Sequence, residues 1–401
     1  MHSRSFRWAA LSALFFALLA CTEAEEPPVP APVDDDDSAP TDDDDSAPTD
    51  DDDSAPTDDD DSAPPQDDDD AVEPSLGERC FPEIWDPAVP GPDYEQYAMT
   101  AGSHCWGTDH QDISGVERVV FVGDSVTVGV PSLGLDLAAW GLPAGAGTPD
   151  AAFYRNVLVP ELVSRFGLTA PSAEWWENWA AVDVVAGTGA VQDSGDFAIC
   201  AKWGARNDDL IQDNNQLSDC IPAGERGKTT LVVMTSGGND LASLTSDHIA
   251  GVESAQTWTK AQEIAAQLRS AMEWFRVPDR FPAGVFVIYG NMYEFTDGTG
   301  QTDSCPAAAL AGFGEPPPNP ELLAEQVIWI QEQYMSIAVD NGMDMIWMLE
   351  HFCGHGWNNE DPTGRCFRGT ETERWFDLSC THPSVPGHAA IAQMFLAVVD
   401  E

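Results

Sequence analysis

Three residues far apart in the sequence carry side chains that could act together on an ester: Ser125, Asn239 and His382. A serine hydroxyl is a weak nucleophile until a base removes its proton, and an imidazole is the side chain that most often does so. An amide N–H can stabilise the oxyanion that forms when the hydroxyl attacks a carbonyl. The three residue types together indicate acyl transfer through a covalent acyl-enzyme.

These side chains need elements that bring them together, and the pattern of apolar residues predicts such elements. Strands are expected at 118–122, 182–186, 230–235, 284–289 and 343–348, and helices at 254–275, 320–339 and 386–399. Strands that alternate with helices favour crossover connections and a parallel sheet. Ser125 follows the first expected strand and Asn239 the third, so both would lie at the carboxyl edge of the sheet, where such folds bind ligands.

The surroundings of these residues resemble sequence blocks of the SGNH hydrolases, also called the GDSL esterase/lipase family. Gly-Asp-Ser at 123–125, Gly-Gly-Asn-Asp-Leu at 237–241 and Cys-Thr-His-Pro-Ser at 380–384 resemble the first, third and last blocks. The resemblance implies an α/β fold, a three-layer flavodoxin-like sandwich with a central parallel sheet. It also implies that Ser125 is the nucleophile, that His382 is the base and that His388 is structural.

The same resemblance implies an oxyanion hole formed by the N–H groups of Ser125 and a glycine, together with the amide of Asn239. We favour Gly204 as this glycine, because the run Lys-Trp-Gly-Ala-Arg-Asn at 202–207 resembles the second block and a short helix is expected after it. Gly187 and Gly189 are alternatives that lie nearer the second expected strand.

The acidic partner of the histidine departs from the family pattern. The family usually has an aspartate three residues before the histidine, and Ser379 occupies that position here. Asp377 could reach the Nδ1 atom of His382 through a longer turn, fixed by a disulfide at Cys380. It would then hold the imidazole tautomer and stabilise the imidazolium. In the alternative, a backbone carbonyl takes this role and the site is a Ser-His dyad.

The first residues indicate export to the cell envelope. Arg4 and Arg7 precede an apolar stretch at 8–20 that is too short to span a bilayer and is typical of a signal peptide. The stretch ends in Leu-Leu-Ala-Cys, which resembles a bacterial lipobox and implies acylation of Cys21. An ordinary signal peptide is the alternative. Thr22, in place of an aspartate, favours the outer membrane or the cell surface.

A strongly acidic repeat follows the cysteine. The unit Asp-Asp-Asp-Asp-Ser-Ala-Pro-Thr recurs with a period of eight between residues 34 and 70, and this composition predicts an extended, disordered stalk. We therefore expect a signal peptide at 1–20, a lipidated stalk at 21–79 and a hydrolase domain at 80–401.

The acidic charge is not confined to the stalk. The whole chain has a net charge of −52; residues 1–79 hold 25 acidic and three basic residues, which leaves 44 acidic and 14 basic residues, a net charge of −30, for the domain. Such a charge argues against nucleic acid or anionic lipid as a tightly bound partner.

The cysteines predict disulfides and not a metal site. Apart from Cys21 the chain has eight cysteines, and an even number in an exported domain implies four disulfides. Spacing suggests the pairs Cys80–Cys105 and Cys200–Cys220, and it leaves the other four cysteines open. His351 and His355 form a His-x-x-x-His pair without a carboxylate partner, so we expect neither a metal nor a cofactor.

The sequence as a whole favours a monomeric serine esterase that acts on lipid or simple acyl esters and is held at the membrane by its lipid. Two alternatives stay open. The 14 tryptophans could stack on sugars in a carbohydrate O-deacetylase. Ser379, in place of the family's aspartate, would instead support a non-catalytic surface binding protein on a degenerate hydrolase scaffold.

Overall fold

The computed structural model describes residues 73–86, 88–129, 150–176, 179, 190–212, 215–305, 307–309 and 312–401. The expected signal peptide, Cys21 and the acidic repeats lie outside these residues. The strand expected at 182–186 and the two alternative glycines, Gly187 and Gly189, also lie outside them. Within the described ranges, no helix is long and apolar enough to cross a membrane.

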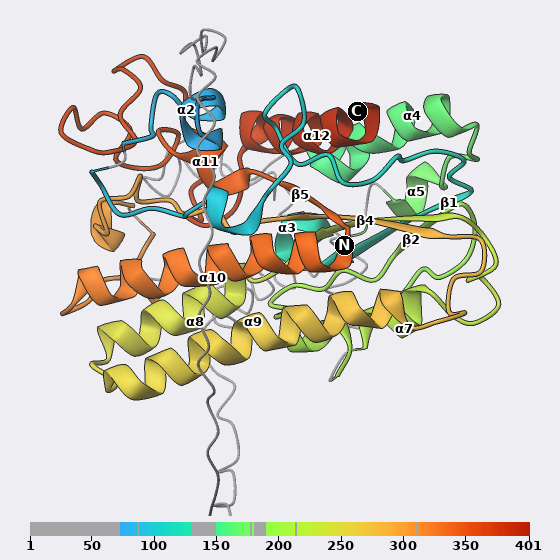
Figure 1. Ribbon diagram of the computed structural model, residues 1–401, viewed down its shortest axis with the longest axis horizontal. Helices are drawn as coiled ribbons and strands as arrows, with labels where there is room; N and C mark the ends of the chain where they lie inside the picture. Colours follow the sequence, from blue (N-terminus) through green and yellow to red (C-terminus); the bar gives the residue numbers. More distant parts are fainter. Residues whose placement is uncertain are drawn as a thin grey trace, which may run out of the picture. The chain divides into compact units, whose positions relative to one another are not determined.

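A parallel five-stranded sheet forms the centre of the described domain (Figure 1), with the strand order β2-β1-β3-β4-β5. The strands are β1 (Arg118–Gly123), β2 (Phe197–Ile199), β3 (Thr230–Thr235), β4 (Val285–Gly290) and β5 (Asp344–Ile346). Flavodoxin-like sheets have this strand order. The expected three-layer α/β fold class is therefore confirmed.

Helices cover both faces of this sheet, as Figure 1 shows. One face carries α4 (Tyr154–Phe166), α5 (Ala173–Trp176) and α12 (Val385–Asp400), and the other carries α7 (Gln216–Cys220), α8 (Gly238–Ile249), α9 (Ser254–Arg276) and α10 (Pro320–Asn341). The described residues also form three short helices, α2 (Leu76–Cys80), α3 (Ser125–Val128) and α11 (Met348–Phe352). The long helices α9, α10 and α12 match the three expected helices within two residues.

The two longest of the helices that were not expected from the sequence are α4 and α8, and each has a local reason for being missed. Pro160 lies inside α4, where a proline normally argues against a helix. The helix α8 begins with glycine, asparagine and aspartate, which are typical of a turn. In both cases packing against the sheet outweighs the local preference.

The sheet is buried on both faces because successive strand residues point to opposite sides. In β1, Val119 and Phe121 pack in the core shared with α4 and α12, whereas Val120 and Val122 pack in the core shared with α8, α9 and α10. All four side chains are fully buried. This two-sided burial explains why the strand reads as one continuous apolar run.

Four disulfides lie within the described residues. Cys80–Cys105 and Cys200–Cys220 were expected from their spacing and are confirmed. The four cysteines that the sequence left open form Cys305–Cys380 and Cys353–Cys366.

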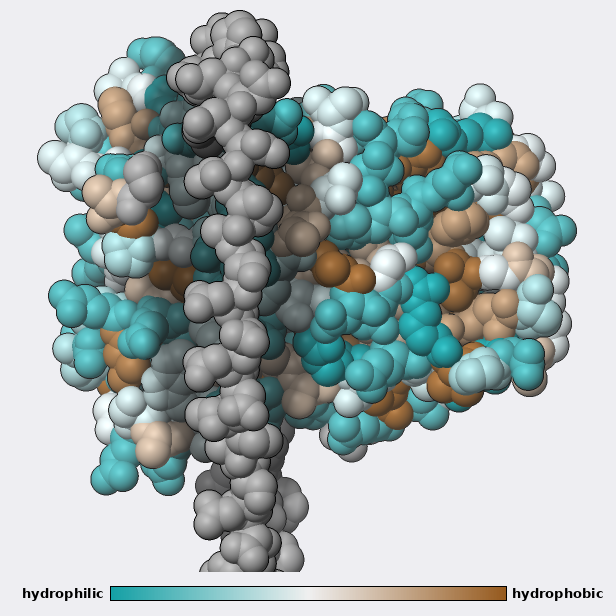
Figure 2. All heavy atoms as spheres, in the orientation of Figure 1, coloured by the Kyte–Doolittle hydropathy of each residue, from teal (hydrophilic) through white to brown (hydrophobic). Residues whose placement is uncertain are grey.

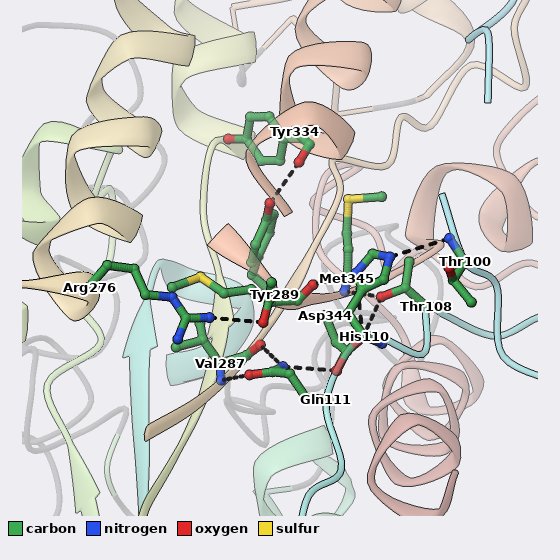
Figure 3. Close-up of polar contacts among 12 residues, drawn as sticks. Thr100, Thr108, His110, Gln111, Arg276, Val287, Tyr289, Tyr334, Asp344 and Met345 are labelled. Atoms are coloured by element: carbon green, nitrogen blue, oxygen red, sulfur yellow. Dashed lines mark hydrogen bonds and ion pairs between the residues drawn. The ribbon is translucent and has the colours of Figure 1, made fainter. Parts of the chain in front are cut away.

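A buried polar cluster attaches residues 108–111 to the edge strand β5 (Figure 3). Asp344 accepts hydrogen bonds from Thr108 Oγ1 (2.7 Å), the backbone N–H of His110 (2.8 Å) and Gln111 Nε2 (2.8 Å). Gln111 also bonds both backbone groups of Val287 in β4. The cluster covers the edge of the sheet at the amino end of β5, away from Ser125, and so protects the strand from pairing with other chains.

Where no grey atoms cover it, the face shown in Figure 2 is mostly polar, and apolar residues form separate groups on it. The exposed large apolar side chains of the described ranges are Val89, Val191, Val277 and Val385. Single exposed valines of this kind are ordinary on a folded domain.

Candidate active site

Ser125 lies at the carboxyl end of β1, in the first turn of α3. The strand ends at Gly123, whose φ is +117° and where a Cβ would lie 1.8 Å from the carbonyl oxygen of Thr235, so that no other residue fits. Asp124 then caps α3, accepting hydrogen bonds from the N–H of Val126 (3.0 Å) and from Thr235 Oγ1 (2.9 Å). These contacts fix the serine's turn to the neighbouring strand β3.

His382 lies directly beside this serine, although 257 residues separate the two in sequence. The Nε2 atom of His382 is 2.8 Å from Ser125 Oγ. Burial lowers the pKa of His382, and the charge of Asp377 offsets only part of that effect. The imidazole is therefore neutral at ordinary pH and within reach of the serine proton, as a general base must be.

Ser379 lies between His382 and Asp377. Its Oγ is 2.7 Å from His382 Nδ1 and donates a hydrogen bond of 2.5 Å to Asp377 Oδ1. The direct contact expected between Asp377 and Nδ1 is thus replaced by a contact through Ser379. The reason is local: Asp377 Oδ1 accepts the N–H of Ser379 (2.8 Å). This Asx-turn directs the Asp377 carboxylate toward the backbone of its own loop and not toward the imidazole.

The loop that carries His382 is tightly held. The N–H of Asp377 donates to the carbonyl of His382 (2.9 Å), and Tyr293 Oη donates to the carbonyl of Thr381 (2.8 Å). Cys380 adopts a left-handed φ of +76° and is bonded to Cys305. A disulfide at Cys380 was part of the expectation for this turn, and the structure identifies its partner.

Asn239 occupies the first turn of α8, after β3. The turn needs Gly237, because its φ is +101° and a Cβ would lie 2.1 Å from Tyr334 Oη. Asn239 Nδ2 donates a hydrogen bond of 2.8 Å to the carbonyl of Ala205. This bond holds the amide at the helix start, where the N-terminal end of α8 also favours negative charge.

Gly204 precedes Ala205 in the segment that follows β2. The N–H of Lys202 in this segment donates to the carbonyl of Gly123 (3.0 Å), so the segment is bonded to both the nucleophile's turn and Asn239. Gly204 has a φ of +75° and open space where a Cβ would be. Ser125, Asn239 and His382 line a common cleft, and Gly204 is not among the described residues that line it.

Ser125, Asn239 and His382 line one cleft of about 870 Å³, within the usual size range of ligand sites. Apolar side chains form most of its walls; α8, α10, α11 and residues 292–313 contribute Leu241, Ala242, Leu323, Val327, Met348, Met292, Phe295 and Phe313. The proposed nucleophile therefore faces a space suited to a hydrocarbon chain.

Buried titratable groups surround the serine and histidine. Burial raises the pKa of Asp124 to about 6 and that of Asp240, which accepts the N–H of Asn207 (3.0 Å), to about 7. Burial lowers the pKa of His388 to about 3, and its Nδ1 accepts the N–H of Tyr154 (3.3 Å). His388 is therefore neutral and serves as an acceptor for the backbone of α4.

The other two histidines noted in the sequence face different partners. His351 Nε2 lies 2.9 Å from the carbonyl of Cys105, and its ring stacks on Trp106. His355 Nδ1 lies 2.6 Å from the carbonyl of Glu373, and its ring stacks on Trp375. Across the described ranges, no three potential ligand side chains come together to hold a metal ion.

Sequence reasoning missed the bridging role of Ser379. The signal was present, because a hydroxyl that can both donate and accept stands where a carboxylate is expected, two residues from an aspartate. Only the folded loop shows that the two side chains lie in series and not side by side.

No protein-family model and no curated protein sequence matches the chain. Solved structures show distant similarity. A phospholipase A1 from Streptomyces albidoflavus NA297 is 18% identical, with a TM-score of 0.39 over 71% of this chain and 98% of that one. A lipase from a goat rumen metagenome is 13% identical, with a TM-score of 0.42 over 70% of this chain and 96% of that one. At this distance the chemistry must be argued from the site's own side chains.

Proposed function

We propose that the chain is a serine ester hydrolase of the SGNH kind. The observation that carries the proposal is the 2.8 Å contact between Ser125 Oγ and His382 Nε2, at a cleft that Asn239 also lines. A neutral imidazole that contacts a serine at the end of a strand is the arrangement that activates a nucleophile. The family resemblance in the sequence blocks points to the same chemistry.

The reaction would run in two steps. His382 accepts the proton of Ser125 as the hydroxyl oxygen attacks the ester carbonyl, and the N–H of Ser125 stabilises the oxyanion together with the Asn239 amide. His382 then donates that proton to the leaving alcohol, which leaves an acyl-enzyme. A water molecule gives a proton to His382 and attacks the acyl carbon. His382 returns this proton to Ser125 Oγ as the bond between Oγ and the acyl carbon breaks and the acid leaves.

The cleft supports esters with a hydrocarbon acyl chain as substrates. Its walls are mostly apolar, whereas a pocket for an acetylated sugar would need convergent polar groups. The net charge of −30 on residues 80–401 also disfavours strongly anionic substrates. Carbohydrate deacetylation is therefore the second candidate.

A fluorophosphonate probe tests the chemistry. We expect the probe to label the purified protein, Ser125→Ala to abolish labelling and Ser218→Ala, which changes a half-buried serine of α7, to leave it intact. A folded protein without Ser125-dependent labelling would refute the hydrolase proposal and favour the surface binding protein. Rates on p-nitrophenyl esters from acetate to palmitate, compared with acetylated xylan, then separate lipid from sugar esters.

We also propose that Cys21 anchors the enzyme at the bacterial envelope, with the acidic repeats as a spacer. The lipobox-like run before Cys21 and the composition of residues 34–70 support this location. In cells fed an alkynyl fatty acid, the wild-type chain should become labelled and sediment with membranes. Cys21→Ala should lose both properties, whereas Cys21→Ala that stays labelled would contradict acylation at this residue.

A further inference from the structure

The hydroxyl of Ser379 makes three polar contacts at once, and the groups involved fix the direction of two of them. It donates to Asp377 Oδ1 (2.5 Å) and receives the backbone N–H of His382 (3.3 Å), while His382 Nδ1 lies 2.7 Å away. Asp377 Oδ1 also receives the N–H of Ser379, so this oxygen is an acceptor in both contacts. The hydroxyl hydrogen is therefore committed to Asp377.

This commitment fixes the tautomer of His382. A hydroxyl has one hydrogen and two lone pairs, and one lone pair already faces the N–H of His382. The remaining lone pair faces Nδ1, so Nδ1 must carry a hydrogen and donate it. Nε2 is then bare and points at Ser125 Oγ from 2.8 Å, which is the tautomer able to take the serine proton.

We propose that Ser379 is a positioning residue, which sets the tautomer and orientation of His382 and transmits the influence of Asp377 to it. The proposal rests on the proposed hydrolase function. In this arrangement, the serine found at the family's aspartate position marks a relay with the carboxylate two residues further back, and not a lost catalytic site. Because the hydroxyl holds Asp377 away from the imidazole, the carboxylate stabilises the imidazolium less than a direct contact would.

Variants of the loop separate a relay from a merely structural serine. Ser379→Ala removes the hydroxyl but keeps the backbone N–H that Asp377 accepts, and we expect kcat/KM to fall about 10²-fold. Ser379→Thr keeps a hydroxyl and should restore most of the activity. Ser384→Ala is the matched control, because Ser384 is a half-buried serine of the same loop whose hydroxyl donates to the carbonyl of Arg374 (3.3 Å) and, among the described residues, has no contact with His382 or Asp377.

Asp377→Asn tests the second half of the relay. An asparagine oxygen can still accept from Ser379, so the tautomer of His382 should be kept while the negative charge is lost. Losing that charge disfavours the imidazolium, so the acidic limb of kcat/KM should move to lower pH by about one unit or less. The buried neighbours Asp124 and His388 are unchanged in every variant.

The tautomer itself can be read without any substrate. Nitrogen-15 NMR of the His382 ring should show Nδ1 protonated above the imidazole pKa in the wild type, in Ser379→Thr and in Asp377→Asn, and mixed tautomers in Ser379→Ala. An unchanged tautomer and an unchanged pH profile in Ser379→Ala would overturn the proposal. Failure of the hydrolase proposal would appear separately, as a wild-type protein whose Ser125 is not labelled by the fluorophosphonate.

Discussion

Asn239 Nδ2 donates a hydrogen bond of 2.8 Å to the carbonyl of Ala205, the residue after Gly204. The bond joins the first turn of α8 to the segment that follows β2. Because the N–H of Lys202 in that segment also bonds the carbonyl of Gly123, hydrogen bonds join the end of β1 to the segment after β2, and that segment to the first turn of α8. This arrangement makes the amide of Asn239 the most direct target for mutation.

Asn239→Ala should lower kcat by about 10²–10³-fold while the protein stays folded, because one donor to the oxyanion is lost. Steady-state kinetics and thermal unfolding followed by circular dichroism measure the two effects. Asn341→Ala is a suitable control, since the Asn341 amide also donates to a backbone carbonyl (2.9 Å) but lies at the end of α10. Full activity in Asn239→Ala would exclude the amide from the oxyanion hole.

Removal of the Cys305–Cys380 disulfide should impair activity beyond its effect on stability, because Cys380 lies two residues before His382. Losing a native disulfide typically costs 2–5 kcal/mol of unfolding free energy. The Cys80–Cys105 pair, which does not line the cleft, provides the comparison. We expect both double-alanine variants to unfold at lower urea concentration, but only the Cys305/Cys380 variant to lose kcat. Equal kcat in the two variants would show that the disulfide does not position the histidine.

Activity should persist into mildly acidic solution. Burial lowers the pKa of His382 from its usual 6.5, so the imidazole stays neutral, and able to act as a base, below that pH. The acidic limb of a kcat/KM profile should therefore have its midpoint below pH 6.5. Burial raises the pKa of Asp124 in the same site to about 6, so this carboxyl could also produce an acidic limb. Asp124→Asn separates the two groups: if His382 produces the limb, the variant should keep it. A midpoint above 6.5 would mean that the imidazolium is stabilised in the fold.

Asp240→Asn should stabilise the protein at neutral and alkaline pH. Burial raises the pKa of Asp240 from 3.8 to about 7, so between these values the folded state binds more protons than the unfolded state and stability falls as pH rises. The asparagine removes this penalty while its oxygen can still accept the N–H of Asn207. Urea unfolding should show a gain of up to about 4 kcal/mol at pH 8 and almost none below pH 4. A gain of the same size at both values would point to a different cause.

The width of the cleft should set the preferred chain length. Val327 of α10 lines the cleft, and Val327→Trp would fill part of it. We expect kcat/KM for a palmitate ester to fall at least tenfold relative to that for an acetate ester, because a steric change in an apolar pocket is worth about 1–3 kcal/mol. Val277→Trp, at a valine that is exposed and outside the cleft, is the control. Equal losses on both esters would place the acyl chain elsewhere.

Residues that depend on local pattern were predictable from the sequence. Burial of regular elements gives a characteristic spacing of apolar residues in the sequence. This spacing predicted β1, the position of Ser125 after it and the long helix α9. Local spacing likewise suggested the disulfides Cys80–Cys105 and Cys200–Cys220. The strand β2 is only three residues long, and three residues are too few to show a period.

The sequence alone determined that a serine, an asparagine and a histidine follow one another in an order suited to acyl transfer. Only the tertiary structure decided how they meet, because the contact between Ser125 and His382 joins residues 257 positions apart. It also decided that the hydroxyl of Ser379 stands between His382 and Asp377. The physical reason is that the direction of a hydrogen bond depends on the conformation of the backbone turn and on which lone pairs are already occupied. Neither can be deduced from the order of residues alone.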